Sequence, residues 1–236
     1  MNVVITGASR GIGKAIAERF AAAGNGLYLC AKNGVQLNDT TSALQQQFPG
    51  AAVQALPADL SQKEDTHRFA NWVLQQTAGS GGPQILINNA GTFTPGSIWN
   101  EADGALENML ATNLYSAYHL TRALLPRMME NGRGHIFNIC SIASLHAYAN
   151  GGSYSISKFA LLGFSRNLRE ELKPHGIKVT AVLPGAVYTD SWKGSGVPEE
   201  RIMQADDIAS LVFAAAALSR QATVEDIIIR PQLGDL

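Results

Sequence analysis

Short apolar runs alternate with longer stretches in which apolar positions recur every three or four residues. Asn2 to Thr6 is a β-branched apolar run, typical of a strand buried on both faces. After it, Ile12, Ile16 and Phe20 have the spacing of one face of a helix. This alternation continues almost to the end of the chain, and it predicts seven strands joined by helices.

The apolar runs and the helical stretches follow one another in a fixed order. The predicted strands are Asn2–Thr6, Leu27–Cys30, Ala52–Leu56, Ile85–Ile87, His135–Ile139, Lys178–Leu183 and Asp226–Ile229. The predicted helices are Ile12 to about Gly24, Val35–Phe48, Gln62–Thr77, Glu101–Met129, Tyr154–Lys173 and Asp206–Leu218. Such alternation favours an α/β fold. We expect a single domain over residues 1–236, a doubly wound parallel seven-stranded Rossmann sheet with helices on both faces.

Two polar residues with complementary chemistry stand where the predicted helix 154–173 begins. Tyr154 and Lys158 are four residues apart, so they lie on one helix face, one turn apart. An ammonium ion beside a phenol lowers the tyrosine pKa from about 10, so that the phenol exchanges protons near neutral pH. Ser141, across a Gly-rich loop, is placed to hydrogen-bond the same reacting oxygen. The alternative for Tyr154 and Lys158 is an ordinary surface pair.

A glycine-rich segment links the first strand to the first helix. Gly7, Gly11 and Gly13 let the backbone approach a pyrophosphate, while the following helix presents free N–H groups and a positive dipole. A plain tight turn is the alternative, but the strand before and the helix after favour a phosphate site.

The residues after the second strand bear on the choice of cofactor. NAD sites usually have an acidic residue about 20 positions past the glycines, but Ala31-Lys32-Asn33 contains no carboxylate. Lys32 and Arg10 suit a 2′-phosphate, so we expect NADP(H) rather than NAD(H), although both could equally be solvated charges. Asp59, which precedes Leu60, either accepts a hydrogen bond from adenine or belongs to the N-cap region of the next helix.

Polar and glycine-rich segments follow several predicted strands. The glycine loop, Asn88 to Gly91, Ser141 and Pro184-Gly185 all fall at the carboxyl edge of the sheet, where such folds bind ligands. Their convergence predicts a single active site. Asn113 lies within a predicted helix, where an asparagine most often points to solvent. Its functional alternative is to help bind a water in a proton relay.

Composition narrows the class of protein. The chain has 236 residues, a formal net charge of -1 and 46% hydrophobic residues, typical of a soluble globular protein and not of a nucleic-acid binder. Cys30 and Cys140 lie in apolar runs, which indicates core positions in a reducing compartment, and the histidines lack metal-ligand spacing. No apolar run is long enough for a membrane span, and no signal peptide is visible. We expect a cytoplasmic protein with no metal.

Together these features resemble the short-chain dehydrogenase/reductase family, in its single-domain branch, which includes 3-oxoacyl-carrier-protein reductases and carbonyl reductases. The motifs are Thr6 to Gly13 (TGASRGIG), Asn88-Asn89-Ala90-Gly91, Asn113, Ser141, Tyr154-x-x-x-Lys158, and Pro184-Gly185 with Thr189. Each motif is weak alone, but their joint order is highly specific and covers essentially the whole chain. The glycine spacing G-x-x-x-G-x-G argues against the larger epimerase and dehydratase members, which more often have G-x-x-G-x-x-G.

The resemblance implies an oxidoreductase that transfers a hydride between NADP(H) and a carbonyl or secondary alcohol. In that assignment Tyr154 is the general acid and base, Lys158 lowers its pKa and binds the nicotinamide ribose, Ser141 holds the substrate oxygen, and Asn113 completes a water-linked proton path. The expected cofactor-binding residues are Gly7, Ser9, Arg10, Gly11, Ile12, Gly13, Lys32, Asp59, Leu60, Asn89, Ala90, Gly91, Tyr154, Lys158, Pro184, Gly185, Val187 and Thr189.

The resemblance also implies a homodimer or homotetramer, commonly joined through the helix that carries the Tyr and Lys. In that helix Phe159 to Phe164 has no polar residue, so we expect a subunit interface there.

Fold and motifs do not name the substrate. Thr189 to Gln204 is either a segment that covers it or an ordinary surface loop. The candidate pocket residues are Phe93, His146, Tyr148, Trp192, Lys193, Val197 and Met203. A catalytically silent dinucleotide-binding sensor is the alternative function; family members of that kind typically lack the Tyr or the Lys, and both are present here.

Overall fold

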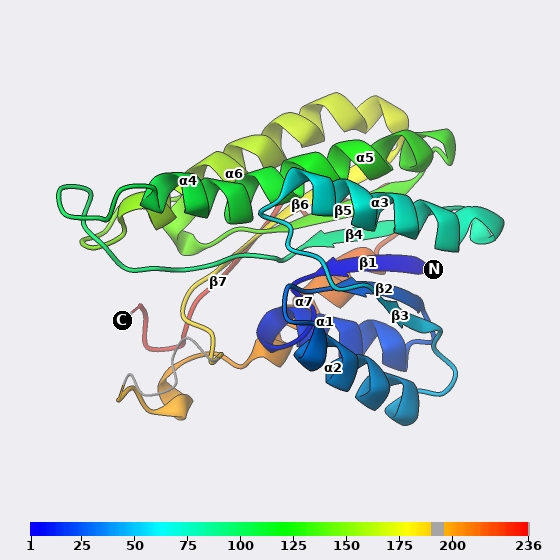
Figure 1. The fold of residues 1–236 in the computed structure, drawn as a ribbon, viewed down its shortest axis with the longest axis horizontal. Helices are drawn as coiled ribbons and strands as arrows, with labels where there is room; N and C mark the ends of the chain where they lie inside the picture. Colours follow the sequence, from blue (N-terminus) through cyan, green and yellow to red (C-terminus); the bar gives the residue numbers. More distant parts are fainter. Residues whose placement is uncertain (190–195, 236) are drawn as a thin grey trace.

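A parallel sheet forms the middle layer of the molecule (Figure 1). The computed structural model describes residues 1–189 and 196–235. Within them the sheet has seven strands in the order β3-β2-β1-β4-β5-β6-β7, all pairing in parallel. The strands are β1 Asn2–Thr6, β2 Gly26–Cys30, β3 Val53–Ala55, β4 Ile85–Asn88, β5 Gly134–Ile139, β6 Ile177–Pro184 and β7 Asp226–Ile229. The predicted doubly wound Rossmann sheet is confirmed.

Helices cover both faces of this sheet (Figure 1). One face carries α1 Gly11–Ala22, α2 Gly34–Gln47 and α7 Ala205–Ala216. The other face carries α3 Lys63–Thr77, α5 Ser116–Glu130 and α6 Gly152–Leu172, and the short α4 Ala105–Leu110 leads into α5. None of these helices, within the described residues, combines the length and the apolar character needed to cross a membrane.

The inner strand β1 shows why apolar residues occupy consecutive positions in the strands. Val3 and Ile5 belong to the core on the α1 side of the sheet, whereas Val4 belongs to the core on the α3 and α5 side. Successive side chains of a strand point to opposite faces. A strand with a helical layer on each face therefore needs apolar residues at consecutive positions.

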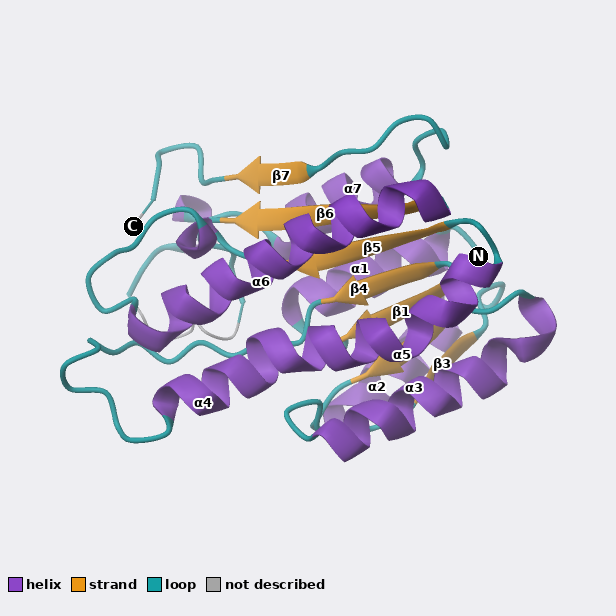
Figure 2. Cartoon of the chain, turned by 90° about the horizontal axis from the view of Figure 1, so that it is seen from above, coloured by secondary structure: helices purple, strands orange, loops and turns teal. Residues whose placement is uncertain are grey.

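The strand order brings two loops together that are far apart in the sequence. β1 pairs with β2 on one side and with β4 on the other, so the chain changes direction across the sheet at this point. Figure 2 shows all the strand arrows pointing to the same edge, which is also where the chain ends. The loops that follow β1 and β4 meet at that edge, and ligands of open parallel sheets bind at such a position.

Some predicted element bounds are wrong. The expected helix Glu101–Met129 is interrupted: residues 101–104 precede α4, and Ala111–Tyr115 form a π-helical turn between α4 and α5. Gly104 has φ 83°, a left-handed conformation that does not belong in an α-helix. The third strand spans Val53–Ala55 rather than Ala52–Leu56, and it lies at the edge of the sheet with β2 as its neighbour.

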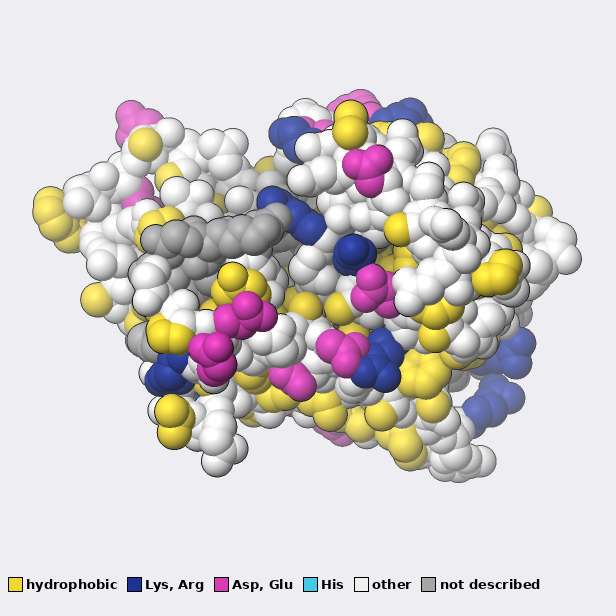
Figure 3. Space-filling view, turned by 90° about the horizontal axis from the view of Figure 1, so that it is seen from below, with side chains coloured by type: hydrophobic (Ala, Val, Ile, Leu, Met, Phe, Trp, Pro, Cys, Tyr) yellow, Lys and Arg dark blue, Asp and Glu magenta, His cyan; other side chains and the backbone are white. Residues whose placement is uncertain are grey.

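The face of the molecule that lies at the bottom of Figure 1 carries both charged and hydrophobic side chains. Figure 3 shows this face, with basic and acidic side chains interspersed among hydrophobic ones. The distribution agrees with the near-zero net charge of the chain.

Candidate active site

The glycine loop packs so tightly that side chains have no room. Gly7 and Gly11 have φ 63° and 53°, left-handed values that glycine adopts readily. A Cβ atom at Gly13 would lie 2.5 Å from Asn89 Nδ2 and would overlap the carbonyl oxygen of Gly7. The first turn of α1 therefore presents bare backbone at the edge of the sheet, as a pyrophosphate site requires.

Asn89 joins the glycine loop to the end of β4. Its Nδ2 donates to the carbonyl oxygens of Thr6 at 2.9 Å and Gly7 at 3.1 Å. In return, Thr6 Oγ1 accepts hydrogen bonds from the backbone N–H of Asn89 at 2.9 Å and of Ala90 at 2.8 Å. These bonds bring the predicted residues of two motifs into one site.

The end of β6 approaches the same loop. Thr189 Cγ2 lies 3.1 Å from the position that a Cβ of Gly11 would take. Val187 forms a parallel bridge with Met203, and Gly185 N donates to the carbonyl oxygen of Ile229 at 2.8 Å. Thr189 therefore lies beside the first turn of α1, whereas Gly185 is bonded to the end of β7.

Tyr154 and Lys158 lie in the first two turns of α6. Lys158 Nζ is 5.8 Å from the centroid of the Tyr154 ring and donates to the carbonyl oxygen of Ile139 at 2.8 Å. Lys158 is buried, with 6% of its surface exposed, whereas Tyr154 is partly exposed. A Cβ at Gly91 would lie 3.6 Å from Lys158 Nζ, so the motif after β4 and the ammonium group are neighbours.

Ser141 lies just past the carboxyl end of β5 and is buried. Its Oγ accepts a hydrogen bond from Ala143 N at 3.1 Å, which leaves the hydroxyl hydrogen free to be donated. A side-chain hydrogen bond with Ser141 lowers the pKa of Tyr154. The structure thus brings Ser141, Tyr154 and Lys158 together, as predicted.

The direction of the Tyr154 pKa shift differs from the prediction. Burial raises the pKa of Tyr154, and the Ser141 hydrogen bond offsets only part of this effect, so the net shift is upward from 10.0. Burial also lowers the pKa of Lys158 to about 8, because the apolar surroundings disfavour the ammonium form. The predicted lowering of the Tyr154 pKa is therefore wrong for this structure: desolvation of the phenolate outweighs its stabilisation.

Asn113 is buried and does not point to solvent. Its Oδ1 accepts from Thr92 N at 2.7 Å, and its Nδ2 donates to Thr92 O at 3.0 Å and to Ser157 Oγ at 2.9 Å. The interpretation of Asn113 as a solvent-facing helix residue is therefore wrong. The π-helical turn around Asn113 places its side chain between the loop after β4 and helix α6.

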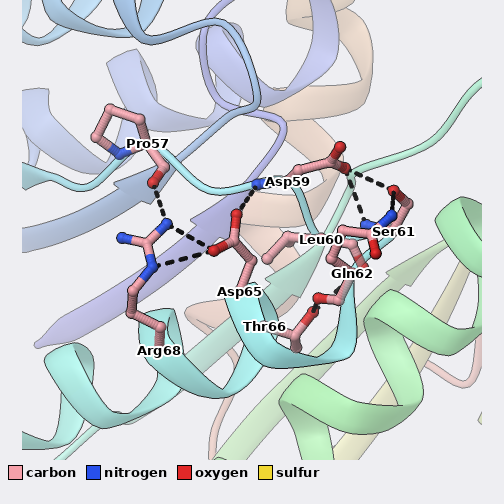
Figure 4. A network of polar contacts seen from close by, with 8 residues as sticks. All are labelled: Pro57, Asp59, Leu60, Ser61, Gln62, Asp65, Thr66 and Arg68. Carbon is pink, nitrogen blue, oxygen red and sulfur yellow. Dashed lines mark hydrogen bonds and ion pairs between the residues drawn. The ribbon is translucent and has the colours of Figure 1, made fainter.

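Lys32 and Asp59 form an ion pair at the ends of β2 and β3. Lys32 Nζ lies 2.8 Å from Asp59 Oδ2, and 78% of the Lys32 side chain is exposed. Burial raises the pKa of Asp59, but hydrogen bonds from Lys32 and Ser61 outweigh it, so the net shift is downward. Figure 4 shows Asp59 bonded to Ser61 through its carboxylate and to Asp65 through its backbone N–H. Gln62, and not Asp59, is the N-cap residue of α3.

Three other predicted cofactor residues have defined positions. The Ser9 carbonyl oxygen accepts a hydrogen bond from Thr40 Oγ1 at 2.8 Å. Ile12 packs against the core on the α1 side of the sheet. Leu60 is a buried core residue on the α3 side of the sheet.

The candidate substrate residues lie in different surroundings, some beside Tyr154 and one in the core. The Phe93 ring meets the Tyr154 ring edge to face, with centroids 4.8 Å apart. Burial, followed by the charge of Tyr154, raises the pKa of Tyr148. Met203 is a core residue on the α1 and α7 side of the sheet. Trp192 and Lys193 lie outside the described residues. Within the described ranges, no group of three or more His, Cys, Asp or Glu side chains is arranged to hold a metal ion.

Three residues with contacts at the site were missed from the sequence. They are Glu101, Ser153 and Ser157. Glu101 accepts a hydrogen bond from Ser153, and Ser157 accepts one from the predicted residue Asn113. Ser153 and Ser157 immediately precede Tyr154 and Lys158, which is a signal in the sequence itself. Their partners lie more than 40 residues away, and no local pattern connects them.

A model of the short chain dehydrogenase family matches residues 1–199. The chain belongs to this family. Like other short-chain dehydrogenases, it is an oxidoreductase with an NAD(P)-binding fold. Sepiapterin reductase of Chlorobaculum tepidum is 32% identical over 242 residues, which cover 99% of this chain and 97% of the relative.

Two solved structures illustrate the likeness of this short-chain dehydrogenase to its relatives. Alcohol dehydrogenase from the archaeon Thermococcus sibiricus, complexed with 5-hydroxy-NADP, has a TM-score of 0.88 and 28% identity over 98% of this chain and 96% of that chain. L-sorbose reductase from Gluconobacter frateurii, complexed with NADPH and L-sorbose, also has a TM-score of 0.88, with 27% identity over 97% and 94% of the two chains.

The residues of this short-chain dehydrogenase fit a bound dinucleotide. Side chains at Gly7 or Gly13 would contact Asn89 or overlap backbone, so the loop keeps its N–H groups accessible. At the other end of the site, Gly91 leaves the approach to Lys158 Nζ open. The glycine loop would hold the pyrophosphate of the dinucleotide, and Lys158 would hold a ribose.

Proposed function

We propose that this short-chain dehydrogenase interconverts a carbonyl compound and a secondary alcohol with NADP(H), using Tyr154 as general acid and base. The observation that carries the proposal is the cluster of Ser141, Tyr154 and Lys158 beside Gly91. Tyr154 shares a side-chain hydrogen bond with Ser141, and Lys158 Nζ lies 5.8 Å from the Tyr154 ring centroid.

Each of these residues has a defined task in the reduction. The nicotinamide, when bound, supplies the hydride. The Tyr154 hydroxyl donates a proton to the substrate oxygen. When substrate binds, Ser141 turns its one hydroxyl hydrogen from Tyr154 to the same oxygen. The raised pKa keeps Tyr154 protonated at neutral pH, which is the form that reduction needs.

Lys158 and Asn113 support this proton transfer. One N–H group of the Lys158 ammonium donates a hydrogen bond to the Ile139 carbonyl oxygen, and two further N–H groups remain for ribose hydroxyls. The positive charge also stabilises the phenolate as the proton leaves. Asn113 fixes Thr92 and Ser157 around the site. The water-linked proton path through Asn113 stays a prediction.

Two features support NADP(H) over NAD(H). Lys32 stands past the end of β2 with most of its side chain exposed, so its ammonium group can turn from Asp59 toward a 2′-phosphate. Arg10, the N-cap residue of α1, adds a second cation beside the glycine loop. The similar alcohol dehydrogenase and L-sorbose reductase were solved with 5-hydroxy-NADP and NADPH.

The proposal is tested by a panel of ketones and aldehydes offered with NADPH and with NADH. We expect NADPH oxidation with at least one carbonyl compound, and loss of that turnover in Tyr154→Phe with dinucleotide binding nearly intact. Full activity of Tyr154→Phe would refute the role of the tyrosine. Tight NADPH binding without oxidation across the panel would instead support the silent sensor.

We also propose a homodimer or homotetramer assembled through α6. Leu161 and Leu162 of this helix are buried in the chain, whereas Ile156 and Phe159 are 41% and 44% exposed. Exposed large apolar side chains on a helix that also has a buried face favour a partner.

The buried, unpaired Cys30 and Cys140 support a reducing compartment such as the cytoplasm.

A further inference from the structure

The start of α6 has no cap of its own. Gly151 occupies the N-cap position and supplies no side-chain hydrogen bond, although the first N–H groups of a helix need acceptors. Tyr154 lies in this first turn. The position of its hydroxyl therefore depends on whatever fixes that turn.

Glu101, from the loop between β4 and α4, supplies the missing acceptor. Its Oε1 accepts from the backbone N–H of Ser153 at 2.9 Å, and its Oε2 accepts from the Ser153 hydroxyl. Ser153 is almost fully buried, at 2% exposure. A carboxylate at a helix N-terminus is also stabilised by the helix dipole.

The backbone around this contact is shaped to admit the carboxylate. Gly152 has φ 32°, and a Cβ there would overlap Glu101 Oε1. Asn150 has φ 60°, a left-handed value that is uncommon outside glycine. Its Oδ1 accepts from Ser97 Oγ at 2.7 Å, and its carbonyl oxygen accepts from Gly96 N at 3.1 Å. The loop that contains Glu101 is thus bound to the segment before α6 at several points.

A second contact repeats this arrangement one turn later. Asn113 donates to Ser157, and it also holds Thr92 in the loop after β4. Ser153 precedes Tyr154 as Ser157 precedes Lys158. Each member of the catalytic pair therefore follows a buried serine that is bound from outside the helix.

We infer that Glu101 is a positioning residue, which fixes the first turn of α6 through Ser153 and so sets the Tyr154 hydroxyl against Ser141. This inference rests on the proposed function, because it assigns Glu101 a task in proton transfer by Tyr154. Glu101 touches neither substrate nor cofactor in this assignment.

The test compares Glu101→Ala, Glu101→Gln and Ser153→Ala with the control Glu107→Gln. Glu107 is exposed and lies in the first turn of α4. Its substitution by Gln changes the net charge by the same amount as Glu101→Gln. Because misplacing a catalytic group by about 1 Å can cost about 100-fold, we expect kcat to fall about tenfold or more in Glu101→Ala. Glu101→Gln, which keeps one acceptor oxygen, and Ser153→Ala, which keeps the backbone bond, should lose less.

Two further measurements separate positioning from loss of the fold. The Kd for NADPH should stay within about twofold of wild type, because the glycine loop is untouched. Amide hydrogen exchange should rise in residues 152–156 of Glu101→Ala and stay at the wild-type rate in the glycine loop. If Glu101→Ala does not fold, Glu101→Gln and Ser153→Ala carry the test.

The outcomes distinguish this inference from the proposed function. If wild type reduces carbonyl compounds and Tyr154→Phe is inactive, the proposed function stands, whatever Glu101→Ala does. A kcat of folded Glu101→Ala equal to that of Glu107→Gln would overturn the positioning role. So would a parallel loss of NADPH affinity and kcat, since that would mean a general structural defect.

Discussion

At the scale of single residues, the environment of Tyr154 decides which form of the phenol is present. Burial raises its pKa above 10.0, the bond with Ser141 lowers it, and burial prevails. A neutral phenol at pH 7 donates a proton without prior ionisation, so the site is prepared for reduction. Oxidation of an alcohol needs the phenolate and so gains from higher pH.

The Tyr154 pKa can be measured without nucleotide or substrate. We expect ultraviolet titration of wild type, with Tyr154→Phe subtracted, to give a phenolate midpoint above about 10. Ser141→Ala should move it higher, because the bond that stabilises the phenolate is lost, whereas exposed Ser219→Ala should leave it unchanged. A wild-type midpoint below about 10 would support the expectation from the sequence that Lys158 prevails.

Lys32 is the residue on which the cofactor preference depends. We expect Lys32→Ala to raise the KM for NADPH about tenfold or more and to leave the KM for NADH nearly unchanged, because a charge-assisted bond to the 2′-phosphate is lost. Lys173→Ala, at the end of α6, is a control for the loss of one positive charge. Equal effects of Lys32→Ala on both coenzymes would remove this argument for NADP(H).

The sequence predicted which residues meet but not how they are held. Ser141, Tyr154 and Lys158 could be predicted because parallel strands and helix periodicity place them locally. The sign of the Tyr154 shift could not, because it depends on how much water the folded chain excludes. The Lys32–Asp59 pair was missed for another reason: each residue had a separate assignment, and only the strand order β3-β2-β1 makes them neighbours.

At the scale of elements, the strands were predicted almost to the residue. β1 and β7 have the expected bounds. In β1 the consecutive apolar residues mark a strand buried on both faces, whereas β7 lies at the edge of the sheet and is partly exposed. The stretch 101–129 was predicted as one helix, whereas the π-helical turn Ala111–Tyr115 interrupts it. Asn113 lies in that turn, and its hydrogen-bond partners Thr92 and Ser157 lie in other elements. Tertiary contacts therefore overrode the local pattern.

The pairing of β5 with β6 contains a buried, titratable group. His135 Nε2 lies 2.8 Å from Thr180 Oγ1, and because the Thr180 hydroxyl donates to Val224 O, the imidazole N–H is the donor. Burial, followed by the nearby charge of Lys178, lowers the pKa of His135 to about 3. The residue is therefore neutral in the folded protein throughout the physiological range.

This histidine makes folding stability depend on pH. Between the unfolded pKa of about 6.5 and the folded pKa of about 3, the unfolded chain binds a proton that the folded chain excludes, so stability falls as the pH falls. The loss approaches about 1.4 kcal/mol per pH unit well below pH 6.5, and it amounts to about 1.6 kcal/mol between pH 6.5 and 5. Urea unfolding of His135→Gln should show a smaller loss over this interval by about that amount. Exposed His175→Gln should behave like wild type; if His135→Gln does too, His135 is not the titrating group.

At the scale of the whole molecule, the sheet fixes the site, and α6 leaves part of its apolar surface exposed. The loops after β1, β4, β5 and β6 lie at one edge, so the geometry of the site is a property of the whole sheet (Figure 2). α6 contributes Tyr154 and Lys158 from one side while Ile156 and Phe159 stay exposed. The sequence showed the apolar run but could not show which of its residues the chain itself covers.

The exposed side of α6 can be tested as a subunit interface. If α6 is a subunit interface, a charge at Phe159 would be buried without a partner, which disfavours association strongly. We expect Phe159→Glu to dissociate the oligomer into a smaller species in size-exclusion chromatography with light scattering. Val35→Glu, at a position 73% exposed in α2 on the other face of the sheet, should keep the wild-type mass. A wild-type protein that is monomeric, or a Phe159→Glu variant of unchanged mass, would contradict assembly through this helix.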